Sequence, residues 1–424
     1  MPGRERFVHM TPGLRFLCII SIFILLSCAV PVSGASLGAA WKVASPTENP
    51  YQGVTFTEDD KKVFAGGQQI IVRTWSGSMQ WGGRSGMIAM IGPDGNYVVS
   101  GVGRSVQVLD KDGADFWNRN MDGQIRAVAV SRNGSLVITA DDKTNINSWA
   151  YNGDFIGRNQ IDLVKSIGIS PKADLVVMAT DGGLRYFSPS LDLIWADNKS
   201  GSLDSWIIFS ADGSTIITAG GNRVSSHTNT GALNWMKDVT SNAIIDIACS
   251  EDCSRIVIGS QDRNILLIDG NGKTLWKYST DQWVNGVDIS DDGSVIAGGT
   301  VDKMLFVLNG DGTVIAKTKA NTIIQQRSVA VSGDGTRIAF SDQTNLYGYD
   351  LLGNTEPLEE TFAPASQITT LGTPTVPITM VTTIIPTIEE VPVTTTTTPK
   401  SSLEPLLVMG AVAILGIIIR KNLR

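Results

Sequence analysis

A short pattern that recurs eight times constrains this chain more than any other feature. Each copy contains an apolar segment, a turn similar to Ser-x-Asp-Gly, a second apolar segment and a small residue. Measured between the serine-like positions of successive turns, from Thr57 to Ser332, the steps are 35, 39, 39, 40, 40, 40 and 42 residues. Self-similarity at a nearly fixed period of this size indicates a repeat architecture rather than several unrelated domains.

Each repeat predicts four short strands. Turn residues with access to positive φ separate β-branched runs, and helical periodicity is absent. In the seventh repeat the expected strands are 284–289, 294–299, 304–308 and 313–317. Eight such units at this period predict an all-β, eight-bladed β-propeller over residues 40–356.

The expected inner strands alternate large and small residues and are apolar on both faces, as a strand sandwiched between neighbouring blades requires. The outer strands often carry a Trp four residues after a turn glycine, as with Gly272 and Trp276. The segment 40–43, Ala-Trp-Lys-Val, resembles the outer-strand segment 275–278, Leu-Trp-Lys-Tyr. We therefore predict that the N-terminal segment supplies the outer strand of the eighth blade and closes the ring, which removes exposed sheet edges.

The N-terminal residues have the layout of a secretory signal. Arg4, Arg6 and Arg15 precede the apolar run 16–30, and small residues follow at 33–36. This order predicts a signal peptide over residues 1–35. Two alternatives stay open: an N-terminal membrane anchor, and a lipidated Cys28 after a segment that loosely resembles a lipobox.

The C-terminal residues have the layout of a tether. Residues 357–403 are rich in Thr and Pro and predict a disordered stalk. Residues 404–424 combine an apolar run with Arg420, Lys421 and Arg424, which predicts a transmembrane anchor with a basic cytoplasmic tail. The layout also resembles the sorting tails of archaeal and bacterial surface proteins, so a retained helix and a processed tail both stay open. Together the two ends predict a membrane-anchored, extracytoplasmic propeller at the cell surface.

Composition excludes several function classes. The chain has only 2 His and 4 Cys, which argues against His-based zinc sites, Ser-His-Asp triads and iron–sulfur clusters. Its formal net charge of -7 argues against nucleic-acid partners. We therefore expect no cofactor and favour a non-catalytic role over an enzyme.

Two motifs resemble a known group of propellers. Residues 271–278 look like a Trp-docking outer strand, and the turns 259–264 and 299–303 look like the Gly-Ser-x-Asp turn of WD-repeats. The chain thus resembles the quinoprotein-like and WD-repeat-like β-propellers found in surface proteins of methanogenic archaea. The resemblance implies the fold over roughly residues 40–356. The adjacent Cys-Cys pair of quinoprotein alcohol dehydrogenases is missing, so the resemblance does not imply their cofactor.

Covalent modifications are predicted at two kinds of site. Cys249 and Cys253 flank one hairpin turn, which predicts a disulfide in an exported domain, with two free thiols as the alternative. Asn133 and Asn198 each begin an N-glycosylation sequon in an expected turn.

The loops that join each outer strand to the next inner strand gather at one mouth of the central channel. The candidate ligand-binding residues at this mouth are Arg126, Lys165, Arg327, Trp206 and Trp283. The cations would attract an anionic ligand or partner, and the Trp rings would stack on a sugar or anchor a protein. The alternative is that these residues cap the channel and pair with Asp246 and Asp288.

The sequence therefore favours a non-catalytic module that binds a protein or glycan at the cell surface. A quinoprotein-like or glycan-acting enzyme is one alternative, and it would need paired carboxylates such as Asp246 and Asp288 in the channel. A structural component of the cell envelope is the other.

Overall fold

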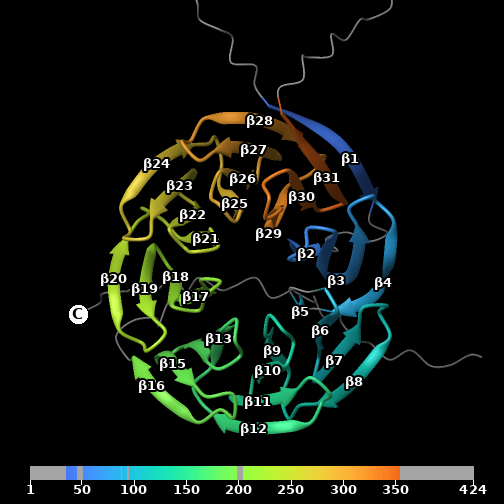
Figure 1. The fold of residues 1–424 in the computed structure, drawn as a ribbon, viewed down its shortest axis with the longest axis vertical. Helices are drawn as coiled ribbons and strands as arrows, with labels where there is room; N and C mark the ends of the chain where they lie inside the picture. Colours follow the sequence, from blue (N-terminus) through green and yellow to red (C-terminus); the bar gives the residue numbers. More distant parts are fainter. Residues whose placement is uncertain (1–34, 45–50, 87, 93–94, 198–203, 354–424) are drawn as a thin grey trace, which may run out of the picture. The chain divides into compact units, whose positions relative to one another are not determined.

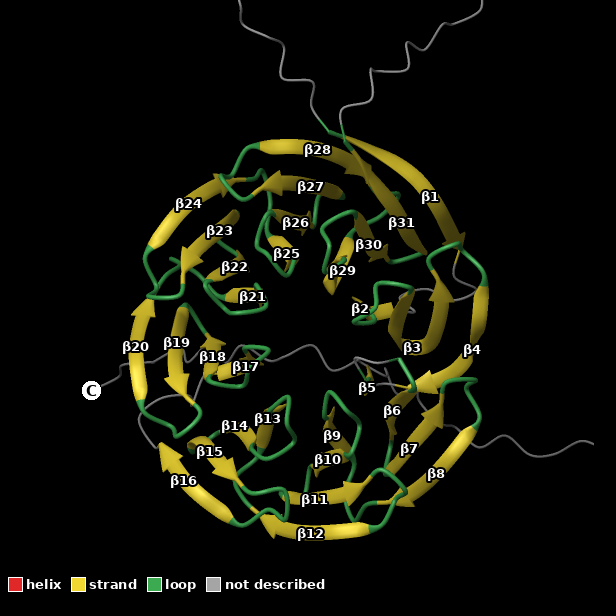
Figure 2. Ribbon diagram, viewed as in Figure 1, coloured by secondary structure: helices red, strands yellow, loops and turns green. Residues whose placement is uncertain are grey.

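The computed structural model describes residues 35–44, 51–86, 88–92, 95–197 and 204–353. These residues form eight β-sheets arranged as a closed ring around a central axis (Figure 1), which confirms the eight-bladed prediction. All regular elements in this part of the chain are strands (Figure 2). No described helix is long and apolar enough to span a membrane. The expected signal peptide (apart from Ala35), stalk and C-terminal anchor lie outside the described residues.

We number the blades 1 to 8 by their inner strands, which surround the axis. These strands are β2 (Tyr51–Phe56), β5 (Ile88–Ile91), β9 (Ile125–Val130), β13 (Val164–Ile169), β17 (Asp204–Phe209), β21 (Ile244–Cys249), β25 (Val284–Ile289) and β29 (Ile324–Val331). The outer strands of blades 1 to 8 are β4 (Met79–Gly86), β8 (Asp115–Asn120), β12 (Phe155–Gln160), β16 (Leu193–Asp197), β20 (Leu233–Asp238), β24 (Thr274–Ser279), β28 (Val314–Lys319) and β1 (Ser36–Ala44).

Two middle strands complete blades 2 to 8. The second strands are β6 (Tyr97–Val102), β10 (Leu136–Asp141), β14 (Val176–Thr180), β18 (Thr215–Gly220), β22 (Arg255–Ser260), β26 (Val295–Thr300) and β30 (Arg337–Asp342). The third strands are β7 (Ser105–Asp110), β11 (Asn145–Ala150), β15 (Gly183–Phe187), β19 (Arg223–Thr228), β23 (Asn264–Asp269), β27 (Met304–Asn309) and β31 (Asn345–Leu352).

Blade 1 departs from the expected four strands. Its single long strand β3 (Lys62–Thr74) pairs with β2 through its first half and with β4 through its second half. The step from the first to the second repeat is only 35 residues, so this repeat has fewer residues for a separate turn.

Apolar side chains fill every interface between blades. Eight clusters of buried residues lie in the ring, one for each pair of neighbouring blades. Strand β10 shows how the alternation works, because Val137 faces the cluster shared with blade 2, whereas Leu136 and Ile138 face the cluster shared with blade 4. Burial on both faces is the arrangement that the two-sided apolar pattern predicted.

The N-terminal strand closes the ring as predicted. Strand β1 pairs antiparallel with β31 from Ser36↔Leu352 to Ala44↔Asn345, so blade 8 contains both ends of the described chain. The indole Nε1 of Trp41 donates to the Trp75 carbonyl of blade 1 at 2.9 Å. Trp276 makes the matching contact between blades 6 and 7, donating to the Gly310 carbonyl at 3.1 Å. The likeness between the two Trp segments therefore reflects equivalent positions in the ring.

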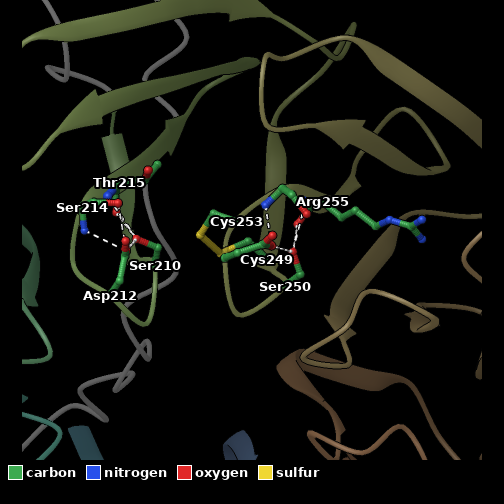
Figure 3. Close-up of a disulfide and its surroundings, with 10 residues drawn as sticks. Ser210, Asp212, Ser214, Thr215, Cys249, Ser250, Cys253 and Arg255 are labelled. Carbon is green, nitrogen blue, oxygen red and sulfur yellow. Dashed lines mark hydrogen bonds between the residues drawn. A yellow bond between two sulfur atoms is a disulfide. The ribbon is translucent and has the colours of Figure 1, made fainter.

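Hydrogen bonds explain the Ser-x-Asp-Gly pattern. In blade 5, Ser210 Oγ donates to Asp212 Oδ1 at 2.6 Å and accepts from the Thr215 backbone N at 3.0 Å. Asp212 Oδ1 also accepts from the Ser214 backbone N at 2.9 Å (Figure 3). These bonds lower the pKa of Asp212 to about 2. The glycine that follows has a φ of +74°, a conformation that costs non-glycine residues energy.

In blade 6 a cysteine occupies this glycine position. Cys253 has a φ of +52°, and its sulfur is bonded to that of Cys249 across the turn (Figure 3). The structure therefore places the two cysteines where the sequence analysis expected a bridge.

We expect Cys253→Gly and Cys253→Ala to differ in stability although both remove the disulfide. Glycine tolerates the left-handed conformation that the other repeats use, whereas the Cβ of alanine makes this conformation unfavourable. The free energy of unfolding of Cys253→Ala should therefore be about 1 kcal/mol below that of Cys253→Gly. Urea unfolding of the two variants measures the difference. Equal stability would show that the turn relaxes away from this conformation.

Candidate functional site

The ring has two different faces. The hairpin turns between first and second strands, and between third and fourth strands, form one of them, which we call the turn face. The connections from each outer strand to the next inner strand form the other, which we call the loop face; they include residues 121–124, 161–163, 239–243, 280–283 and 320–323.

A cation–aromatic contact crosses the channel at the loop face. The guanidinium carbon of Arg327 in blade 8 lies 3.6 Å from the ring centroid of Trp206 in blade 5. Because blades 5 and 8 are not neighbours, this contact spans the central opening. Arg327 has a φ of +57°, and the pairing of β29 with β30 is irregular between Ile324 and Val329. The irregular stretch coincides with the longest repeat step, 42 residues.

The other candidate residues of the mouth have separate surroundings. Lys165 Nζ lies 2.8 Å from Asp181 Oδ1 of the same blade. Trp283 is 46% exposed. Arg126 is also exposed, and no ion pair to it is found within the described ranges. The structure thus joins one of the three predicted cations to one of the two predicted Trp residues.

Two carboxyl groups of the inner strands, those of Asp246 and Asp288, have raised pKa values. Burial raises the pKa of Asp246 to about 7, against the lowering effects of the Val287 N–H and the Arg327 charge. Burial also raises the pKa of Asp288 to about 7, and the nearby charge of Asp246 adds to this rise. Arg327 is an exposed residue. The surrounding blades nevertheless remove water from its guanidinium and lower its pKa, whereas the negative charge of Asp246 acts to raise this pKa.

These carboxylates connect neighbouring blades. Asp246 Oδ2 accepts from the Val287 backbone N at 3.0 Å, and Asp288 Oδ2 accepts from the Val331 backbone N at 2.8 Å. Asp246 is only 6% exposed. A glycan-acting pair would need both carboxyl groups open to one substrate, whereas Asp288 lines a cavity to which Asp246 does not contribute. The geometry therefore gives the pair a structural role.

The raised pKa values predict that the fold loses stability as pH rises. The pKa of an aspartate in an unfolded chain is about 3.9, whereas the pKa of Asp246 in the fold is about 7. Between these two pH values the folded chain holds a proton that the unfolded chain has lost. Raising the pH from 6.5 to 8.5 should therefore lower the free energy of unfolding by about 1 kcal/mol through Asp246 alone.

Urea unfolding at both pH values measures this change. Asp246→Asn cannot ionise and should make the slope smaller. A stability that rises with pH in this window, or a slope that the substitution leaves unchanged, would contradict the assignment.

A cavity opens on the turn face, on the side of the ring opposite the predicted mouth. It has a volume of about 540 Å³ and is lined by residues at the turn ends of all eight inner strands. Its charged lining residues are Glu58, Asp60, Arg132, Glu251, Asp288 and Asp291. This set was not predicted from the sequence, because the long loops between blades were the expected binding site. Aligning the repeats would have shown a signal, since Glu58, Arg132, Glu251 and Asp291 all follow the serine-like residue of their turns.

One of the two predicted sequons lies within the described residues. Asn133 is exposed, and its Oδ1 accepts from the Ser131 Oγ at 2.9 Å, as an aspartate does in other repeats. Asn198 lies outside the described residues. Across the described ranges, no cluster of three or more His, Cys, Asp or Glu side chains could hold a metal ion.

Comparison with known proteins identifies the fold. No family model matches the chain, and no curated protein matches it at a significant level. The structure is similar to the C-terminal WD40 domain of Sif2, with a TM-score of 0.62 and 14% identity over 75% of this chain and 99% of that one. It is also similar to BamB from Moraxella catarrhalis, with a TM-score of 0.56 and 14% identity over 74% of this chain and 99% of that one. Likeness at this identity shows the β-propeller fold and gives no support to an archaeal source or to quinoprotein chemistry.

Proposed function

We propose that this chain is a membrane-tethered, extracytoplasmic β-propeller that binds a protein partner through its loop face. The observation that carries the proposal is the Arg327–Trp206 pair over the channel. Arg and Trp are enriched among the residues that dominate binding energy at protein interfaces. No hydrogen bond from the Arg327 guanidinium to another residue of the described ring is found, so its planar donors are available to a partner.

Trp283 extends the same face. It belongs to the connection between β24 and β25, and it is 46% exposed. An exposed indole buries a large apolar area when a partner covers it. Trp283, the exposed Arg126 and the Arg327–Trp206 pair therefore supply apolar contact and positive charge on one face of an otherwise acidic chain.

The tether rests on the sequence. The apolar run 16–30, the Thr/Pro-rich segment 357–403 and the apolar run before Arg420 fit export, a stalk and an anchor in that order. Protease added to intact cells should then cut within residues 357–403 and release the folded ring. A ring that stays protected until the cells are lysed would contradict the proposed location.

Affinity enrichment from cross-linked envelopes tests the loop face. Compared with the wild type, Arg327→Ala and Trp283→Ala should each recover at least tenfold less of the partner. Lys273→Ala is the matched control, because Lys273 is an exposed residue at the turn face. Arg327→Lys tests the stacked geometry, since it keeps the charge and loses the planar group. Recovery that is insensitive to both loop-face changes would refute the proposal.

A further inference from the structure

The turn-face cavity is a second site, on the face opposite the proposed protein interface. Its volume of about 540 Å³ is within the range of pockets that hold small molecules. Backbone hydrogen bonds between blades hold its rim in place: the Ala211 N–H donates to the Glu251 carbonyl at 2.8 Å, and the Glu251 N–H donates to the Asp291 carbonyl at 2.9 Å. The Asp291 N–H continues this series by donating to the Gly333 carbonyl at 3.0 Å. The rim is therefore formed before any ligand arrives.

The cavity has an apolar sector and, beside it, an acidic sector. Blades 4 and 5 contribute only uncharged lining residues, namely Ile167, Gly168, Ile169, Pro171, Ile207, Ile208, Phe209 and Ala211. Blades 6 and 7 contribute the carboxylates Glu251, Asp288 and Asp291. Seen along the axis, β13 and β17 lie beside each other in the ring and are followed by β21 and β25 (Figure 1). The apolar and the acidic lining residues therefore occupy two adjacent sectors of the cavity.

The described lining residues of the acidic sector include no cation that would balance its carboxylates. Arg132 is the one cation among the described lining residues, and it forms an ion pair with Glu58. Asp60 accepts the Gly333 N–H at 2.9 Å. By contrast, no hydrogen bond or ion pair to the side chains of Glu251 and Asp291 is found within the described ring. Burial, together with the charges of Glu251 and Asp60, raises the pKa of Asp291, and the positive charge of Arg132 offsets this rise only in part.

We propose that the turn-face cavity binds a small amphipathic organic cation, with its apolar body against blades 4 and 5 and its ammonium group among Glu251, Asp288 and Asp291. An ammonium supplies the missing positive charge, and an attached ring or alkyl chain covers the apolar sector. A neutral apolar ligand would desolvate the carboxylates without compensation. These carboxylates do not form a group that could hold a metal ion among the described residues, which favours a charge carried on an organic group.

Calorimetric titration of the full chain with 2-phenylethylammonium tests the proposal. We expect saturable, one-to-one binding of this cation. The neutral analogue 2-phenylethanol and plain ammonium chloride, at matched ionic strength, should each bind at least tenfold more weakly, because each offers only one half of the complementarity. Equal binding of the alcohol, or no binding of the arylalkyl cation, would overturn the proposal.

Charge variants locate the site. The double variant Glu251→Gln/Asp291→Asn should weaken binding at least tenfold. Asp212→Asn is the matched control, because this turn carboxylate does not line the cavity and an asparagine occupies the equivalent position at residue 133. A loss of affinity in the control that equals the loss in the double variant would place the cation elsewhere.

A variant that gains affinity excludes misfolding as an explanation. Arg132→Gln removes the lining cation and frees Glu58 from its ion pair. It should therefore bind 2-phenylethylammonium several-fold more tightly than the wild type. Weaker binding by this variant would contradict the proposed electrostatics. Because the site lies opposite the loop face, the result is independent of partner binding there.

Discussion

Replacing Trp41 with alanine is expected to lower the free energy of unfolding by about 3 kcal/mol. The indole donates to the Trp75 carbonyl at 2.9 Å and packs edge-on against the Trp75 ring, with centroids 5.6 Å apart. It also covers Gly348, where an added Cβ would collide with the indole. Loss of this side chain therefore weakens the pairing of β1 with blade 8 and the contact between blades 8 and 1 together. Urea unfolding measures the change.

Three comparisons make this prediction specific. Trp276→Ala should cost a similar amount, because Trp276 makes the equivalent contact between blades 6 and 7. Leu275→Ala should cost well under 1 kcal/mol, because Leu275 is an outer-strand residue that is already 46% exposed. Deletion of residues 36–44 should abolish cooperative unfolding, since it opens the ring and exposes the edge of β31. A cost below 1 kcal/mol for Trp41→Ala would show that β1 is dispensable for closure.

Asp342→Ala is expected to have an effect of similar size, about 3 kcal/mol. Asp342 Oδ2 accepts from the backbone N–H groups of Asn321 and Thr322, at 3.1 and 3.0 Å, and from the Tyr347 hydroxyl at 2.8 Å. Its Oδ1 accepts from further backbone N–H groups in the turn between β30 and β31. Although burial opposes it, this set of donors lowers the pKa of Asp342. Truncation would leave several buried donors without a partner.

Asp302→Ala is the matched control. Asp302 occupies the corresponding turn of blade 7, but the hydrogen bond found for its carboxylate is from the Thr300 hydroxyl. We expect its replacement to cost no more than about 1 kcal/mol by thermal or urea unfolding. Equal costs for the two aspartates would contradict the view that Asp342 stabilises blade 8 through its backbone donors.

The repeat pattern made the ring predictable. Period, turn chemistry and two-sided apolar strands are local properties that every blade shares, so eight copies reinforce one interpretation. Ring closure was also predictable, because Trp41 lies in a segment similar to that of Trp276. The three-stranded form of blade 1 was harder to foresee, since the 35-residue step indicated a shortened repeat without showing which turn was affected.

The sites depend on contacts between distant repeats, which the sequence does not encode locally. Arg327 and Trp206 were both placed at the loop-face mouth, but their contact depends on the left-handed backbone of Arg327 and on its reach across the channel. The turn-face cavity was missed because Glu251 and Asp291 looked like ordinary solvated turn residues. Their significance arises only when closure of the ring places them beside the apolar ends of β13 and β17, around one cavity.

Site-specific photo-cross-linking in intact cells would show directly whether the loop face binds a protein. A photoreactive phenylalanine analogue would replace Trp283 on the loop face or Asn271 on the turn face. We expect a discrete, light-dependent adduct from position 283, none from position 271, and loss of the adduct when Arg327→Ala is added. Adducts of equal yield from both faces, or from position 271 alone, would contradict binding through the loop face.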